Sequence, residues 1–214
     1  MAQPWGLVVP VKLLALAKTR LSAYGTVARA ELALAFATDV LDAALACPAV
    51  QQVVVVTDDV RAAAALERPG CRVVPDLPGA GLNPALEHGA ALLRATRPGR
   101  PVAALAADLP ALRAGDLEAA LDAALDAVEQ RAFVPDAAGQ GTTLLAAREG
   151  HPLRPAYGPG SRARHRGSGA AELDAAAALR QDVDTPQDLL AAMEIGLGAR
   201  TAAVVAALAL PRPA

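Results

Sequence analysis

The chain has 214 residues, of which 54% are hydrophobic and 2% are aromatic, and its formal net charge is −2. This length and hydrophobic content predict one large domain with a substantial core, and they exclude a chain that is disordered throughout. The small net charge gives no support for nucleic acid or a membrane surface as a partner, and two cysteines are too few for a disulfide scaffold. We therefore expect a cytoplasmic protein without a signal peptide or a transmembrane helix.

The first half of the chain alternates between apolar runs, which predict buried strands, and helical patterns. In chain order we expect a strand at Gly6–Val11, a loop over 12–25, a helix at Thr26–Ala46, a strand at Gln51–Thr57, a short helix capped by Asp58 or Asp59, a strand at Cys71–Val74 and a helix from Asn83 to about Thr96. Asn83 is the expected N-cap of that last helix, because the proline after it is favoured at a first helical position.

The second half continues the alternation. We expect a strand that runs towards Asp108, a helix from Asp116 to about Gln130, strands at Ala132–Pro135 and Thr142–Ala147, a loop-rich insertion at about 150–169, a helix at Ala170–Ala178, an extended piece at Gln181–Asp184, a helix from Thr185 to about Ile195 and a final helix over 201–210. Thr185 begins a variant capping box, in which Asp188 replaces the usual Glu. The pattern predicts a single α/β domain over 1–214, with a mainly parallel sheet.

The stretch 102–112, VAALAADLPAL, carries the first candidate site residue. Its continuous apolar run predicts a strand buried on both faces, and such a strand ends at the edge of an open sheet, where α/β folds bind ligands. Asp108 at this edge is a candidate metal ligand. The alternative is that Asp108 caps a turn or the following helix.

The loop after the first strand holds every lysine of the chain, Lys12 and Lys18, together with Arg20. Three cations at the carboxyl end of a strand suit a polyphosphate. The loop lacks the Walker pattern, so it is not a P-loop. The alternative is an ordinary solvated loop.

A second carboxylate group, Asp182 and Asp184, alternates along an extended piece just before a helix. Mg²⁺ prefers one or two carboxylates together with phosphate oxygens and water. Asp108 and Asp184 supply such a pair if the fold brings them together, and otherwise the second group is a capped turn.

Two glycine-rich loops, at 139–143 and 157–161, offer backbone N–H groups and hydroxyls to an anion. Ser161 is also a possible cap of a short helix, SRARHR, whose N-terminus would favour a phosphate. His165 lies among the arginines of that helix, which are either a solvated face or a site for a substrate phosphate or carboxylate. Together with the cation loop, these segments predict two anionic ligands.

Several motifs occur in a fixed order along nearly the whole chain: VPVK (9–12), AKTRL (17–21), GLNPAL (81–86), DLPAL (108–112), GQGTTLL (139–145), GPGSRARH (158–165) and DVDTPQDL (182–189). This series resembles the CofC/FbiD family of coenzyme F420 biosynthesis, whose members are guanylyltransferases acting on 2-phospho-L-lactate or phosphoenolpyruvate. The high Ala and Arg content looks like the actinobacterial branch, which uses phosphoenolpyruvate. The resemblance implies a three-layer, Rossmann-like nucleotidyltransferase fold, similar to that of the molybdenum-cofactor guanylyltransferases.

The resemblance also implies roles for single residues. It implies Mg²⁺ on Asp108 and Asp184, the substrate phosphate on Thr142, Gly158 and Ser161, the GTP phosphates near Lys12, Lys18 and Arg20, and a nucleotide-binding role for Asn83, within the nucleotide site. The family often has GGTN around the Gly/Thr loop, whereas this chain reads GQGTTL and lacks the Asn.

The reaction implied is GTP plus phosphoenolpyruvate giving enolpyruvyl-diphospho-guanosine and pyrophosphate, in which a downstream transferase of the coenzyme pathway can receive the product. Three alternatives stay open: 2-phospho-L-lactate as the substrate, another nucleotidyltransferase for a molybdopterin or a sugar phosphate, and a non-catalytic nucleotide-binding protein. The second rival usually has a glycine-rich loop after the first strand, and here no glycine lies between Lys12 and Leu21.

Overall fold

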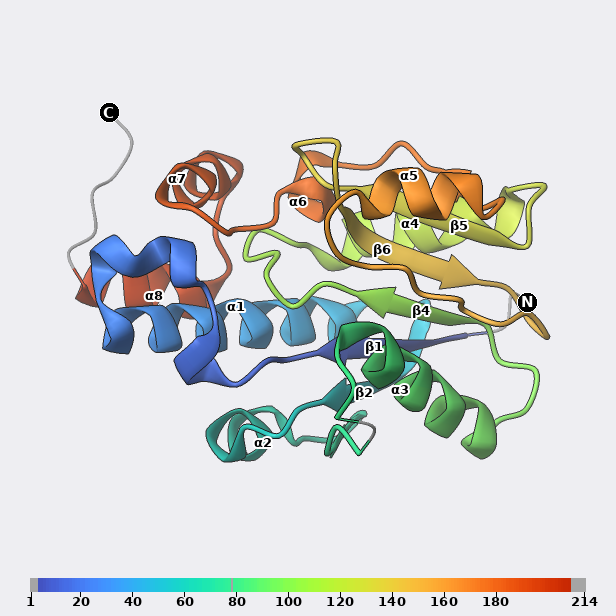
Figure 1. Ribbon diagram of the computed structural model, residues 1–214, viewed down its shortest axis with the longest axis horizontal. Helices are drawn as coiled ribbons and strands as arrows, with labels where there is room; N and C mark the ends of the chain where they lie inside the picture. Colours follow the sequence, from blue (N-terminus) through green and yellow to red (C-terminus); the bar gives the residue numbers. More distant parts are fainter. Residues whose placement is uncertain (1–3, 78, 209–214) are drawn as a thin grey trace.

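The computed structural model describes residues 4–77 and 79–208, and within them seven strands form one sheet in the order β3-β2-β1-β4-β6-β5-β7 (Figure 1). The strands are β1 (Trp5–Pro10), β2 (Val50–Val56), β3 (Cys71–Val74), β4 (Val102–Leu105), β5 (Arg131–Pro135), β6 (Thr142–Ala147) and β7 (Ala171–Glu172).

The direction of β6 decides where its ends lie. It pairs antiparallel with both β4 and β5, whereas all other pairings in the sheet are parallel. Leu105 at the end of β4 pairs with Leu144, and Pro135 at the end of β5 pairs with Thr142. The first residue of β6 therefore lies at the same edge as the carboxyl ends of β1, β4 and β5, which is the edge where α/β sheets bind ligands.

Helices cover both faces of the sheet (Figure 1). They are α1 (Thr26–Ala46), α2 (Val60–Leu66), α3 (Leu82–Thr96), α4 (Ala114–Asp126), α5 (Ser161–Gly167), α6 (Ala177–Arg180), α7 (Pro186–Ile195) and α8 (Ala199–Ala207), with 3₁₀ turns η1 (Leu14–Leu16) and η2 (Thr19–Tyr24). Buried side chains of α1 and α4 form one core with one face of the strands, and those of α3 form a second core with the other face. No helix in the described part of the chain is long and apolar enough to cross a membrane.

Successive side chains of β1 point to opposite faces of the sheet, so this strand contributes to both cores. Leu7 and Val9 belong to the core of α1 and α4, and Val8 belongs to the core of α3. Helix α3 comes so close to β1 that a Cβ at Gly89 would lie 2.5 Å from Val8 Cγ1. The glycine therefore sets how closely α3 packs on the sheet.

A third, smaller core joins the end of the chain to α1. It contains Phe36 of α1, Leu189 of α7 and Val205 of α8. The buried carboxylate of Asp39 in α1 accepts hydrogen bonds from the N–H groups of Arg200 (2.9 Å) and Thr201 (2.8 Å). Since these two N–H groups have no partner within α8, Asp39 caps this helix from another part of the chain.

Most of the predicted elements are confirmed. The bounds of α1, β3 and β6 are those predicted, Asp59 accepts from Ala62 N–H and caps α2, and Thr185 forms the capping box with Asp188. The predicted tail helix begins earlier, at Ala199, and its residues 209–210 lie outside the described residues.

Several predictions about the starts of helices are wrong. Helix α3 begins at Leu82 with Gly81 as its N-cap, because the Asn83 amide bonds a distant loop instead. Helix α5 is preceded by Gly160 in the left-handed conformation, so Ser161 is its first residue and not its cap. Asp116 lies in the first turn of α4, which begins at Ala114.

The helix predicted at Ala170–Ala178 is replaced by a short strand, β7, and then α6. Alanine favours a helix, but here Leu173 N–H donates to Phe133 C=O (2.9 Å) along the open edge of β5. Pairing with this edge overrides the local preference.

Replacing Asp39 by Ala is expected to lower the free energy of unfolding by about 1–2 kcal/mol, because two N–H groups of α8 lose their cap. Chemical denaturation of wild type and variant measures the difference. Asp42→Ala is the control, since Asp42 lies on the exposed side of α1 in an ion pair with Arg68, and its loss is expected to cost about 0.5 kcal/mol or less. Equal losses in the two variants would show that the cap contributes nothing.

Candidate active site

A cavity of about 710 Å³ lies at the carboxyl edge of the sheet. Its walls come from the residues after β1, the η1 and η2 turns, the start of α3, the residues after β4, the β5–β6 turn, the loop before α5 and the segment before α7. It contains most of the predicted site residues: Lys12, Lys18, Arg20, Asp108, Thr142, Gly158, Ser161 and Asp184.

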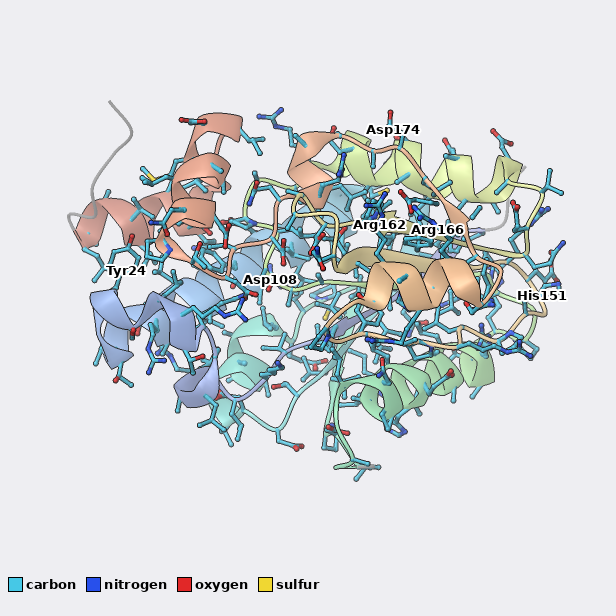
Figure 2. All side chains as sticks on the ribbon, turned by 45° about the horizontal axis from the view of Figure 1, so that its top comes forward. Tyr24, Asp108, His151, Arg162, Arg166 and Asp174 are labelled. Carbon is cyan, nitrogen blue, oxygen red and sulfur yellow. The ribbon has the colours of Figure 1, made fainter. Side chains whose placement is uncertain are left out.

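Two aspartates meet around one lysine in this cavity. The Lys18 ammonium donates a hydrogen bond to Asp108 Oδ2 and another to Asp184 Oδ1 (3.0 Å). Between the two segments, Val183 N–H donates to the carbonyl of Asp108 (3.0 Å). This backbone bond explains why residues far apart in sequence share a site. Figure 2 shows Asp108 near the middle of the molecule.

The charges of this cluster stabilise one another. Burial alone would lower the pKa of Lys18, but the Asp108 and Asp184 carboxylates outweigh it and raise the pKa. Burial likewise acts to raise the pKa of Asp184, and the Lys18 charge outweighs it and lowers this pKa. Lys18 and Asp184 are therefore both ionised near neutral pH.

The other two predicted cations stand apart from Lys18. Lys12 is exposed at the mouth of the cavity, and Arg20 is 3.8 Å from Asp184 Oδ2 with a side chain that is 73% exposed. Lys18, in contrast, has a side chain that is only 10% exposed, and its ammonium group forms ion pairs with two carboxylates. The sequence suggested that the three act alike, and the structure separates them.

Two further aspartates line the cavity: Asp136, which was not singled out from the sequence, and Asp182, which was given no role there apart from its pairing with Asp184. Asp136 follows β5 and accepts from the N–H groups of Gln140 and Gly141, both at 2.8 Å. Burial, followed by the charges of Asp108, Asp184 and Asp136, raises the pKa of Asp182 to about 7. Their signal was the one used for Asp108, an acid placed directly after a strand or an extended piece.

Thr142 and Ser161 line the cavity with buried hydroxyl groups. Ala156 N–H donates to His165 Nε2 (2.9 Å), so the proton of the neutral ring is on Nδ1 and is donated to Thr142 Oγ1 (2.9 Å). Ser161 Oγ also donates to Thr142 Oγ1, at 3.3 Å. Thr142 thus accepts twice, and its own proton is left to be donated into the cavity.

His165 itself does not reach the cavity. It is fully buried, both of its ring nitrogens are engaged, and the Phe133 and Tyr157 rings pack against it. Burial, followed by Arg131 and Arg164, lowers its pKa from 6.5 to about 4. The prediction of a direct substrate contact is corrected: His165 is a neutral group that orients Thr142.

The arginines around His165 are also turned away. Arg162 Nη2 lies 2.6 Å from the Glu172 carboxylate, and Arg166 pairs with the same carboxylate. Figure 2 shows the two arginines close together, and their shared partner Glu172 belongs to β7. The helix is thus a charged outer face and not a second anion site.

Asn83 lies beside the cavity but does not line it in the structure. Its amide accepts from Tyr157 N–H (2.8 Å) and donates to the Tyr157 carbonyl (3.2 Å). The loop that follows contains Gly158 (φ 117°) and Gly160 (φ 72°), in conformations that favour glycine. The direct nucleotide contact predicted for Asn83 is therefore replaced by a structural one, the anchoring of this loop.

The carboxylates of Asp108 and Asp184 fit a divalent cation, since they already hold one positive charge, the Lys18 ammonium, between them. Oxygen donors of this kind suit Mg²⁺, which takes its remaining ligands from phosphates and water. Among residues 4–77 and 79–208, no group of three or more His, Cys, Asp or Glu side chains is arranged to hold a metal ion. The chain thus offers a pair of carboxylates and no closed metal site.

Known proteins share both the sequence and the fold. A model of the MobA-like NTP transferase domain matches residues 34–196. A protein of Streptomyces scabiei named phosphoenolpyruvate guanylyltransferase is 60% identical, over 97% of this chain and 98% of that protein. A protein of the same name from Thermomonospora curvata is 57% identical, over 94% of this chain and 89% of that protein.

A solved structure from Desulfovibrio desulfuricans, provisionally described as a nucleotide-diphospho-sugar transferase, superposes with a TM-score of 0.67. It covers 97% of each chain at 20% identity, a likeness that shows the fold alone. The predicted α/β nucleotidyltransferase fold with a mainly parallel mixed sheet is confirmed.

Between about pH 6.5 and pH 4, His165 is expected to lower the free energy of unfolding as the pH decreases, because unfolded His165 takes up a proton that the folded protein excludes. Asp182, whose folded pKa is about 7, acts in the opposite direction over the same range, so the contribution of His165 is read as the difference between the wild type and His165→Gln. The lowered pKa of His165, about 4 instead of 6.5, corresponds to a loss of up to about 3 kcal/mol. Chemical denaturation across this pH range measures it. In His165→Gln this part of the pH dependence is expected to vanish.

His151→Gln is the matched control for this experiment, because His151 lies outside the His165 cluster, in the loop after β6. It is expected to keep the wild-type pH dependence. A His165→Gln variant whose stability falls with pH as steeply as the wild type would contradict the assignment of a neutral, buried ring.

Proposed function

Because this chain belongs to the phosphoenolpyruvate guanylyltransferase family and carries its MobA-like NTP transferase domain, we propose that it transfers GMP from GTP to phosphoenolpyruvate. The products are enolpyruvyl-diphospho-guanosine and pyrophosphate. An oxygen of the substrate phosphate attacks the α-phosphorus of GTP in line and forms a new O–P bond. The bond from the α-phosphorus to its bridging oxygen breaks, and pyrophosphate leaves with the bonding electrons.

One observation carries this proposal: a single cavity holds an aspartate pair around a cation, two exposed cations and a hydroxyl that is set to donate. Phosphoryl-type transfer needs positioning and charge neutralisation more than a protein nucleophile. The cavity accordingly offers charged groups and hydrogen-bond donors on several sides.

In this proposal the groups of the cavity have distinct roles. Thr142 donates a hydrogen bond to the phosphate of phosphoenolpyruvate, and Ser161 turns its hydroxyl proton from Thr142 Oγ1 to the same phosphate when the substrate binds. The open backbone at Gly158 lets that phosphate come close. Lys12 and Arg20 neutralise the β- and γ-phosphates as pyrophosphate forms. Lys18 keeps Asp108 and Asp184 in place and takes part with the other two cations on the nucleotide side.

Asp108 and Asp184 would hold Mg²⁺ in this proposal. When bound, the metal ion supplies neutralisation of the phosphate oxygens and orients the substrate and GTP phosphates towards each other. The support on this chain is its donor set, two carboxylates that already share one positive charge.

The wider setting follows from the same resemblance. We place the reaction in coenzyme F420 biosynthesis and in the cytoplasm, where GTP and phosphoenolpyruvate are available. A transient contact with the downstream transferase would protect the product. The whole of 1–214 acts as one nucleotidyltransferase unit, with 150–169 as its substrate-binding insertion.

2-Phospho-L-lactate is the second candidate substrate, since it presents the same phosphate and carboxylate on three carbons. The groups proposed here for the substrate phosphate do not distinguish it from phosphoenolpyruvate. The relatives at 60% and 57% identity, both named for phosphoenolpyruvate, favour the first candidate.

Pyrophosphate release is expected with GTP, Mg²⁺ and phosphoenolpyruvate, and at a rate at least tenfold lower with 2-phospho-L-lactate. The assay is run with and without the downstream transferase, so that an unstable product is drawn off in one arm. No release with either substrate in either arm would remove the proposed function, and GTP binding without release would point to a non-catalytic nucleotide-binding protein.

Asp108→Asn is expected to lower metal-dependent turnover by about 10²-fold or more, because one carboxylate of the pair is lost while the shape of the side chain is kept. Circular dichroism and the thermal midpoint check that the fold is intact. Asp174→Asn, at an exposed position outside the cavity, is the matched control. Rates like the wild type in Asp108→Asn would sink the metal assignment.

A further inference from the structure

A second cleft, of about 510 Å³, lies at the opposite edge of the sheet, where the parallel strands begin. It lies between the starts of β2 and β3 and the end of α3. Its polar walls are Gln51, Gln52, Arg72, Thr96, Arg97 and Arg100. This cleft shares no lining residue with the catalytic cavity, and the proposed reaction assigns it no role.

Arg100 is buried in the cleft, and no carboxylate of the described residues forms an ion pair with it. Its residue is only 5% exposed, and its guanidinium donates to the side-chain oxygens of Gln52 (2.7 Å) and Gln51 (3.0 Å). Its Nε is buried and has no partner within the described part of the chain. A buried charge without an opposite charge is costly, so the pairing of Arg100 is incomplete.

The remaining walls offer mainly donors, and within the described part of the chain none of their side chains is acidic. Gln51 Oε1 also accepts from Arg97 Nη1 (2.7 Å), and since arginine can only donate, both glutamine oxygens must face the guanidinium groups. Their NH₂ groups are then the free ends of the amides. No Asp or Glu lines the cleft in the described chain, and Arg72 has no side-chain partner there.

A structural role accounts for part of this arrangement. Arg97 is a cation at the C-terminal end of α3, where a positive charge is favourable, and Arg100 links β2 to the segment before β4. This role leaves Arg72 and the Nε of Arg100 unexplained. The sheet also makes room for Arg100, because a Cβ at Gly6 would lie 2.8 Å from its Cδ.

We infer that this arginine cleft binds a small anion that carries a phosphoryl group. Guanidinium groups match the geometry of phosphate oxygens in paired hydrogen bonds. Three of them together with two amide NH₂ groups can surround one phosphate, and a phosphorylated metabolite fits a cleft of this volume.

Helix α3 links the arginine cleft to the catalytic cavity. Leu82 and Leu86, at the start of this helix, line that cavity, while Thr96, at its end, lines the arginine cleft. One helix of 15 residues therefore lines both sites. An anion held by Arg97 and Arg100 would bind at the C-terminal end of α3, the helix whose first turn anchors the loop before α5 through Asn83.

Inorganic phosphate is the probe for this proposal, titrated into the whole chain labelled with ¹⁵N-arginine. The Nε–H resonance of Arg100 is expected to shift and to saturate in the millimolar range. In the Arg72→Gln/Arg97→Gln variant, the dissociation constant read on Arg100 is expected to rise at least tenfold. Both substituted residues are exposed, and an unchanged thermal midpoint checks the fold.

Arg61→Gln/Arg113→Gln is the matched control, because it removes the same charge from outside both cavities. It is expected to bind phosphate as the wild type does. Asp108→Asn is expected to leave the Arg100 shift intact, which separates this site from the catalytic cavity. An unchanged constant in Arg72→Gln/Arg97→Gln, an equal weakening in the control, or an Arg100 resonance that does not saturate would overturn the proposal.

Discussion

The candidate active site depends on one ammonium group that two carboxylates share. Lys18 contacts Asp108 and Asp184, which lie 90 and 166 residues away from it along the chain. Two carboxylates this close repel each other unless a positive charge lies between them. The loop after β1, the end of β4 and the start of α7 are therefore held together by a charge balance. A metal ion that binds the two carboxylates adds positive charge to this cluster, and the negative charge of bound phosphates offsets it. The cavity is therefore suited to metal-bound phosphates.

The residues whose signal is local were predictable from the sequence. Asp108 stands just after an apolar run, and Asp184 stands just before a capping box, so both are placed at the edge of the sheet by their immediate neighbours. The roles of Asn83 and His165 were misjudged because their partners are distant in sequence. Asn83 bonds the backbone of Tyr157, 74 residues away, and His165 bonds Thr142, 23 residues away. No local pattern contains these pairings.

The same division applies to the fold. Clearly bounded segments, such as the long helix α1 and the continuously apolar strand β6, were predicted with their bounds. The segment 170–178 is rich in alanine and was predicted as a helix, yet its first part pairs with the open edge of β5. The reversed direction of β6 was equally hidden, since a buried strand reads the same in either direction. This reversal places Thr142 beside the two aspartates, so the geometry of the site depends on topology as much as on composition.

The backbone bond between Val183 and Asp108 has a consequence for synthesis. The chain leaves the ribosome from its N-terminus, and domains begin to fold as they emerge. Strands β1 to β6 are complete at Ala147, but the second carboxylate arrives only with Asp184, and α8 is capped later still. A nascent chain can thus form most of its sheet before its acidic pair exists. The carboxylate pair proposed to act on nucleotides therefore forms last, after strands β1 to β6 have been synthesised.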